Sequence, residues 1–153
     1  MSHSHTLQNI NLETALKMAQ AALAKGREAK MAPLVVAVLD VRGVLKAYLA
    51  EEGTSLYRFQ IAQGKALGAL GMGFGGQELE RRAGQAPMFI HAVQALTEGN
   101  MVPVRGGVLI RNAKGELLGA MGISGDTSPN DEICAVSGIT AAGLVADCGA
   151  PTA

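Results

Sequence analysis

Four charged side chains have types and spacings that suit chemistry on a small ligand. Arg58 and Lys65 lie seven positions apart in a predicted helix, so both lie on one face and could hold a carboxylate. Asp131 and Glu132 follow Ser128 by three and four positions, and either could serve as a general base. Each pair also has a structural interpretation: a solvated helix face for the cations, and a capping box at a helix entrance for the acids. Spacing alone favours the structural interpretation of both pairs.

His91 is the one histidine in the part of the chain expected to fold, and its neighbours are apolar (MFIHAV). It could ligate haem iron or shuttle a proton near neutral pH. A core or interface position is the commoner role of an isolated histidine in such a segment. His3 and His5 predict adventitious metal binding at most. Since the chain has no Ser-His-Asp, C-x-x-C, H-E-x-x-H or P-loop pattern, no metal centre is predicted.

Two glycine-containing segments could either bind a ligand or only connect neighbouring elements of the chain. Residues 71–76 (GMGFGG) match G-x-G-x-x-G, but they follow a predicted helix and no strand precedes them. Dinucleotide binding is therefore rejected, and a flexible joint is predicted. Ser124 and Gly125 begin the segment before the last predicted helix, where backbone amides could meet an anion. A tight strand-to-helix connection would have the same sequence.

The overall composition argues against several classes of partner. The 153 residues include 13 basic and 13 acidic side chains, three Phe, two Tyr and no Trp, which argues against nucleic-acid binding. Charged residues make up 17% of the chain, below the usual ~25%, so we expect part of the surface to be covered in a homo-oligomer. The chain shows neither a signal-peptide core nor an apolar run near the roughly 20 residues that cross a bilayer. These features predict a cytoplasmic protein with no membrane attachment.

The two cysteines, Cys134 and Cys148, are expected within one terminal helix, 14 positions apart. That spacing places them about 21 Å apart along the helix axis, too far for a disulfide. Both are predicted to be buried or half-buried free thiols, which suits a reducing compartment.

Hydrophobic periodicity and turn signals predict the elements that position these residues. Asn11 is the expected N-cap of a helix ending near Gly26, and Thr54 or Ser55 should cap a second helix that ends near Leu70. The remaining segments are a short helix at 77–82, an irregular stretch at 83–99, a final helix from 128 to about 147, and strands at 33–40, 44–50, 101–104, 108–111 and 117–123. Consecutive hairpins with helices before and after them indicate an α+β fold with an antiparallel sheet.

The second predicted helix is crowded with small residues, including Gly64 and Gly68 one turn apart. Each glycine costs up to ~1 kcal/mol relative to alanine in a helix interior. We therefore expect this face to pack closely against another backbone. The chain is predicted to form one domain over residues 11–148, with flexible tails at 1–10 and 149–153.

Several of these segments together resemble the GlcG/HbpS-like haem-binding family, which also includes the C-terminal domain of PduO-type corrinoid adenosyltransferases. The resemblance spans roughly residues 12–145, and its most specific part is GAMGISG at 119–125 followed by Asp131-Glu132. It implies a single domain with a central five-stranded antiparallel sheet flanked by helices, assembly into homo-oligomers, and haem or tetrapyrrole binding in some members. The positions that match the family are Lys65, Gly106, Gly107, Ser124, Gly125, Asp131 and Glu132. Arg42 and Ala50 depart from the family pattern, where a turn glycine and an arginine are usual.

Three functions are compatible with these residues. The first is a small homo-oligomeric ligand-binding protein of the GlcG/HbpS type that holds haem or a related tetrapyrrole. In that case His91, Arg58, Gly106, Gly107, Ser124 and Gly125 are the candidate cofactor-binding residues. The alternative is an enzyme acting on a small organic acid, such as a tautomerase, isomerase or deaminase, with Lys65, Asp131 and Glu132 as catalytic candidates. A second alternative is an accessory assembly subunit, so the sequence leaves open whether the protein is an enzyme.

Overall fold

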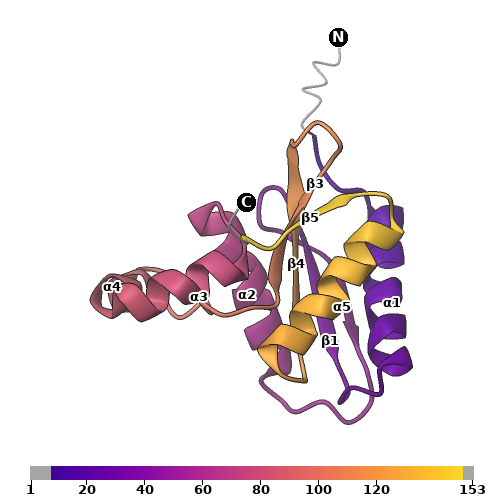
Figure 1. Cartoon of the computed structure of the whole chain (residues 1–153), viewed down its shortest axis with the longest axis horizontal. Helices are drawn as coiled ribbons and strands as arrows, with labels where there is room; N and C mark the ends of the chain where they lie inside the picture. The colour runs from indigo at the N-terminus through magenta and orange to yellow at the C-terminus, as the bar shows by residue number, and fades with distance from the viewer. Residues whose placement is uncertain (1–7, 150–153) are drawn as a thin grey trace.

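A five-stranded antiparallel sheet runs through the middle of the molecule, with helices on both faces (Figure 1). The structure is a computed structural model that describes residues 8–149. The strands are β1 (Val35–Asp40), β2 (Leu45–Ala50), β3 (Gly107–Arg111), β4 (Leu117–Ser124) and β5 (Val145–Asp147), in the spatial order β2-β1-β4-β3-β5. The helices are α1 (Leu12–Glu28), α2 (Arg58–Met72), α3 (Gly76–Gln85), α4 (Pro87–Leu96) and α5 (Ser128–Ala141). The predicted α+β class and the five-stranded antiparallel sheet are confirmed.

Two tight turns set the registers of the sheet. The β1–β2 hairpin turns at Arg42-Gly43, where Gly43 has a φ of +82°, and the β3–β4 hairpin turns through Asn112 to Gly115. Every residue of β1 is buried, because β1 lies between β2 and β4 and helices cover both of its faces. The two hairpins therefore bring the ends of β1 and β4 together, with Val35 opposite Ser124.

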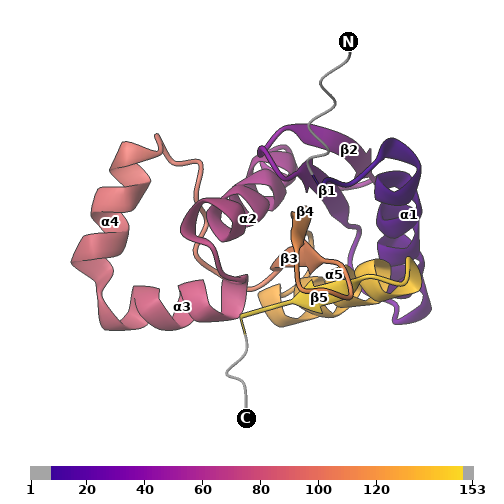
Figure 2. The same ribbon diagram turned by 90° about the horizontal axis from the view of Figure 1, so that it is seen from above.

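Helices α1 and α5 cover one face of the sheet and α2 covers the other (Figure 2). Asn11 caps α1, as predicted, and its side chain accepts a hydrogen bond from the Thr14 amide at 2.8 Å. Alternate strand residues divide between the faces: Val36, Val38, Met121 and Ile123 pack in the same core cluster as α1 and α5, whereas Leu39 and Ala120 pack with α2. This period-two division gives each helix layer its own apolar core.

Small residues let α2 approach its neighbours closely, as the sequence predicted. A Cβ on Gly64 would stand 2.7 Å from Val102, and one on Gly68 would stand 2.9 Å from Met101. On the sheet side, a Cβ on Gly122 would collide with the carbonyl oxygen of Ala62. Gly122 of β4 is therefore required by contact with the backbone of α2, whereas Gly64 and Gly68 leave room for the side chains of Val102 and Met101.

Helices α3 and α4 project sideways from the sheet (Figures 1 and 2). The segment 71–76 joins α2 to α3, with Gly73 in the left-handed conformation at the end of α2 and Gly75 as the N-cap of α3. The segment therefore joins two helices, as predicted, and its flexibility stays a prediction. The prediction that residues 83–99 are irregular is wrong, because most of this segment forms the end of α3 and the whole of α4.

Several predicted boundaries are also wrong. Residues 101–104 form no strand; this segment packs along α2, with the Val102 amide donating to the Gly64 carbonyl at 3.0 Å. The fifth strand is β5, because α5 ends at Ala141 and Gly143 turns the chain with a φ of +75°. Helix α2 begins at Arg58 with no side-chain cap, and the side chain of Thr127, one residue before Ser128, caps α5.

The end of α5 changes the position of the second cysteine. Cys148 follows β5 and does not share a helix with Cys134. Both thiols are free, Cys134 buried and Cys148 half-buried, as predicted. Burial raises the pKa of Cys134 to about 11 and that of Cys148 to about 12, so both are weak nucleophiles at neutral pH.

Parts of the predicted tails, with His3 and His5, lie outside the described residues. Within the described part of the first tail, Ile10 is buried and its amide donates to the Leu118 carbonyl at 3.2 Å. None of the helices between residues 8 and 149 has the length and apolarity that a bilayer crossing requires.

The contact between Gly122 and Ala62 predicts a large effect from one methyl group. We expect Gly122→Ala to lower the free energy of unfolding by at least about 1–3 kcal/mol, because α2 must move off the sheet. Gly84→Ala is the matched control: it lies in α3 with open space around it, and alanine should raise stability by up to about 1 kcal/mol. Urea denaturation measures both, and equal stability of the two variants would contradict the close packing.

Candidate functional site

Lys65 and Asp131 form an ion pair that is almost completely buried. The Lys65 Nζ lies 3.0 Å from the Asp131 Oδ2, and the two side chains are 2% and 1% exposed. The same Nζ donates to the Ile123 carbonyl at 2.9 Å, so one lysine of α2 holds the end of β4 and the first turns of α5. The interpretation of Lys65 as part of a solvated helix face is therefore wrong.

Burial shifts the pKa of each partner in the direction that favours its neutral form. Loss of solvation lowers the pKa of Lys65, and the nearby Asp131 carboxylate opposes that shift. Loss of solvation likewise raises the pKa of Asp131, opposed by the Lys65 ammonium. The pair is thus held by mutual attraction in a place where either charge alone would be unfavourable.

The Asp131 carboxylate does not form the predicted capping box. Thr127 caps the helix, and the second Asp131 oxygen, Oδ1, accepts a hydrogen bond from the Asp126 amide at 3.0 Å. Asp131 therefore fixes the β4–α5 connection as well as the lysine. Its role follows from a partner 66 positions away, which sequence spacing could not reveal.

Glu132 is also buried, at 7% exposure, but it is only half satisfied. Its Oε1 accepts from the Gln77 amide nitrogen of α3 at 2.6 Å, and its Oε2 has no hydrogen-bond partner among the described residues. Burial raises the pKa of this carboxyl group. Glu132 is therefore the acid in this region with an uncommitted oxygen.

Two glycines leave room for the lysine. Gly106 has a φ of +107°, and a Cβ on it would stand 2.9 Å from the Lys65 Nζ and 3.0 Å from the Ile123 oxygen. A Cβ on Gly107 would collide with the Lys65 backbone. These positions thus have a packing explanation that does not involve a ligand.

The polar cluster, defined here as Arg58, Lys65, Ser124 and Asp131, gathers predicted site residues around the end of β4, whereas the Glu132 side chain bonds to Gln77 of α3. Arg58 joins it through a hydrogen bond from its Nη1 to the Ser124 Oγ at 3.2 Å. Gly106 and Gly107 wall the lysine, and Gly125, with a φ of +151°, makes the turn after Ser124. The structure therefore brings together the predicted site residues except His91 and Glu132, whose side chain bonds to α3.

His91 lies on α4, away from this cluster, and is exposed. Phe89 and Val93, two positions before and after it, line a cavity. Because residues two apart in a helix are about 200° apart around its axis, His91 projects from the opposite side of α4. Its predicted roles in ligand binding remain predictions, and they require a ligand outside this cavity.

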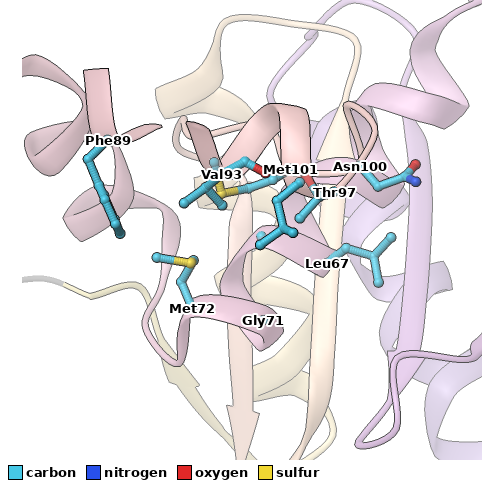
Figure 3. A pocket seen from close by; sticks show the side chains of 10 residues that line it. Leu67, Gly71, Met72, Phe89, Val93, Thr97, Asn100 and Met101 are labelled. Atoms are coloured by element: carbon cyan, nitrogen blue, oxygen red, sulfur yellow. Dashed lines mark hydrogen bonds between the residues drawn. The ribbon is translucent and has the colours of Figure 1, made fainter. Parts of the chain in front are cut away.

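An apolar cavity of ≈ 340 Å³ between α2 and α4 was not predicted from the sequence. Its lining comprises Leu67, Gly68, Gly71, Met72, Phe89, Val93, Leu96, Thr97, Asn100 and Met101 (Figure 3). One signal was present: Phe89, Val93 and Leu96 recur at steps of four and three, which is typical of one helix face. The pattern is short, and the irregular segment predicted at 83–99 includes these residues, so it did not indicate a helix face.

The cavity suits a flat apolar ligand better than a charged one. Within the described part of the chain its lining has no charged side chain, and its polar side chains are Thr97 and Asn100. The Thr97 hydroxyl donates back to the Val93 carbonyl at 2.9 Å. The lining also contains the thioether groups of Met72 and Met101, which are polarizable and can adapt their shape to an apolar ligand.

Comparison with known proteins gives consistent results. The model of the family described as haem degrading protein HbpS-like matches residues 10–140. A PduOC–haem complex has 23% sequence identity and a TM-score of 0.79, covering 89% of this chain and 96% of that one. Klebsiella pneumoniae ORFY has 24% identity and a TM-score of 0.79, covering 94% and 97%. HbpS has 26% identity and a TM-score of 0.75, covering 92% and 96%. No protein of curated function matches the chain.

The buried ion pair predicts a specific thermodynamic cycle. Lys65→Met should lower the free energy of unfolding at neutral pH by about 3–5 kcal/mol, because Asp131 loses its buried partner. The double variant Lys65→Met/Asp131→Asn should recover part of that loss, since the asparagine oxygen can still accept from Asp126. Denaturant titration of the three proteins tests this, and a Lys65→Met protein as stable as the wild type would refute it.

The buried Glu132 predicts how stability changes with pH. Because its pKa is raised in the folded state above the usual value of 4.5, the folded protein holds this proton more tightly than the unfolded chain. The contribution of Glu132 to stability should therefore decline as pH rises from about 4.5 through the raised pKa.

Glu132→Gln removes this titration and keeps an oxygen for Gln77. The stability difference between wild type and variant should shift in favour of the variant as pH rises, when unfolding is measured from pH ~4 to ~8. A difference that is constant across that range would show that Glu132 titrates alike in both states.

Proposed function

The chain belongs to the HbpS-like family of haem degrading proteins, and on that premise we propose that it is a homo-oligomer that binds haem or a related tetrapyrrole in the cavity between α2 and α4. The cavity itself is the observation that carries the proposal. Its volume of ≈ 340 Å³ lies within the range of about 300–1,000 Å³ that is typical of small-molecule sites. Such sites combine an apolar lining with a few polar groups, which describes this one.

The residues present fit a tetrapyrrole chemically. The macrocycle is flat and apolar, and its negative charge is confined to the propionates at one edge. Leu67, Val93 and Leu96 offer apolar contacts, and the Phe89 ring offers an aromatic face for stacking. Because the charged edge finds no cation in the lining, we place the propionates at the open side of the cavity.

Arg58 and Lys65, the cations predicted to hold a carboxylate, do not line this cavity. Lys65 is committed to Asp131 and Ile123. Arg58 begins α2, and Leu67, the first residue of that helix in the lining, follows it by nine positions, or about 14 Å along the helix. We therefore assign Arg58 and Lys65 to a separate polar cluster, whose contribution to binding remains a proposal.

The exposed apolar residues of α4 support the proposed homo-oligomer. Met88 is 86% exposed, Leu96 is 82% exposed and Phe89 is 56% exposed, on a helix that stands away from the sheet. Apolar residues gathered in this way mark interaction surfaces. A second copy placed against α4 would cover them together with the part of a macrocycle that extends beyond the cavity. The free cysteines suit the cytoplasm that the sequence predicts.

A second candidate function, an enzyme acting on a small organic acid, would use Glu132. Its uncommitted Oε2 favours this function, because a buried carboxyl group whose pKa is raised by burial can act as a general acid or base. Loss of turnover in Glu132→Gln, with haem binding unchanged, would favour this function over the first.

Titration with haemin tests the cavity directly, in a protein with His3→Ala and His5→Ala so that no terminal imidazole binds iron. Gly71→Leu adds a side chain at the cavity lining, at a position where a Cβ meets no atom within 4 Å. We expect a saturable shift of the Soret band in the parent protein and at least tenfold weaker binding in Gly71→Leu.

Gly84→Leu is the matched control, because it makes the same change in open space on α3, outside the cavity lining. It should bind haemin like the parent. Equal binding by all three proteins would place the ligand elsewhere, and a titration that does not saturate in the parent would reject tetrapyrrole binding.

A further inference from the structure

The cavity lining contains few groups that can donate electrons to a metal. They are the thioethers of Met72 and Met101, the hydroxyl of Thr97 and the amide of Asn100. Haem iron accepts a thioether as an axial ligand, whereas neutral hydroxyl and amide oxygens are harder donors, better suited to hard cations. The choice within this lining is therefore between the two methionines.

Met101 is fixed in the core. It is 2% exposed and belongs to the apolar cluster that contains Leu79 and Ile90. Its Cγ packs beneath Gly68, where a Cβ would stand only 2.9 Å away. Movement of this side chain toward a ligand would open a void in that cluster, which is unfavourable.

Met72 is held less tightly than Met101. It is half-buried, and its side chain extends into the space between α2 and α4 on the same side as Phe89 (Figure 3). It is the last residue of α2, directly before Gly73, whose left-handed conformation ends the helix. Met72 packs at the edge of the cluster that contains Met101, but an unbranched, half-buried side chain at a helix end can adjust its sulfur position more easily than a fully buried one.

We propose that the Met72 sulfur is an axial ligand of the iron when a haem occupies the cavity, an assignment that rests on the proposed function. The bond is formed by a sulfur lone pair donated to the iron, so no proton is transferred and no co-reactant is needed. His91 does not supply this bond within the same chain, because it lies on the other side of α4 from Phe89 and Val93. A thioether ligand also favours the reduced metal and raises the reduction potential of the haem.

The test compares Met72→Leu with the parent that lacks His3 and His5. Leucine is close to methionine in volume and apolarity, so the cavity keeps its shape and loses only the sulfur. In the parent we expect the far-red absorption band that arises from sulfur-to-iron charge transfer. In Met72→Leu that band should disappear, haemin should bind about tenfold more weakly, and the reduction potential of the bound haem should fall.

Two controls isolate the metal–sulfur bond. Gly84→Leu, outside the cavity lining, should keep the band and the affinity, and so should His91→Ala. Protoporphyrin IX without iron should bind equally to the parent and to Met72→Leu, because that ligand cannot use the sulfur. A general effect on cavity packing would instead weaken both porphyrins.

The outcomes separate this inference from the proposed function. If haemin binds and Gly71→Leu blocks it, but Met72→Leu keeps an unchanged spectrum, the Met72 assignment is wrong and the cavity stands. If His91→Ala removes the axial ligand signature, the iron is held by His91, and the assignment is again wrong. If Gly71→Leu has no effect on haemin binding, the proposed cavity itself is wrong.

Discussion

The buried pair of Lys65 and Asp131 is the contact around which the rest of this fold is arranged. It joins three elements that are distant in sequence, because the Lys65 ammonium bonds to α5 through Asp131 and to β4 through Ile123. Gly106 and Gly107 are explained by it, since any side chain there would displace the lysine. A charge pair in this position contributes little net stability, but removal of either partner is costly, so it enforces one arrangement of α2 on the sheet.

That arrangement also determines the apolar cavity at the other end of α2. Residues Leu67 to Met72 form one wall, and their position follows from the packing of α2 between β4 and the returning segment at Met101 and Val102. The opposite wall is α4, which connects to α2 through α3 and the glycine joint at 71–76 and, on its other side, through the segment that returns along α2 at Met101 and Val102. One wall is therefore fixed by the core, whereas the other is carried by a projecting pair of helices, an arrangement that suits a site where a ligand must enter.

Charge and apolarity are thus separated along a single helix. The beginning of α2 carries Arg58 and Lys65, whose partners are polar groups at the end of β4. The end of α2 carries Gly71 and Met72, which face an uncharged cavity. The end of α2 therefore suits a ligand that is apolar over most of its surface.

The sequence by itself determined whatever depends on neighbouring residues: the Asn11 cap, the Gly43 and Gly115 turns, the small face of α2, and the α+β order of the elements. These features follow from steric limits and from periodicities of two and 3.6 residues, which are local. Only the tertiary structure decided that Asp131 pairs with Lys65 rather than capping its helix, that β5 replaces 101–104 as the fifth strand, and that α4 forms a cavity wall. Each of these features depends on contacts between residues far apart in the chain. The residues next to one partner in the sequence do not show which distant residue it will contact or how strongly.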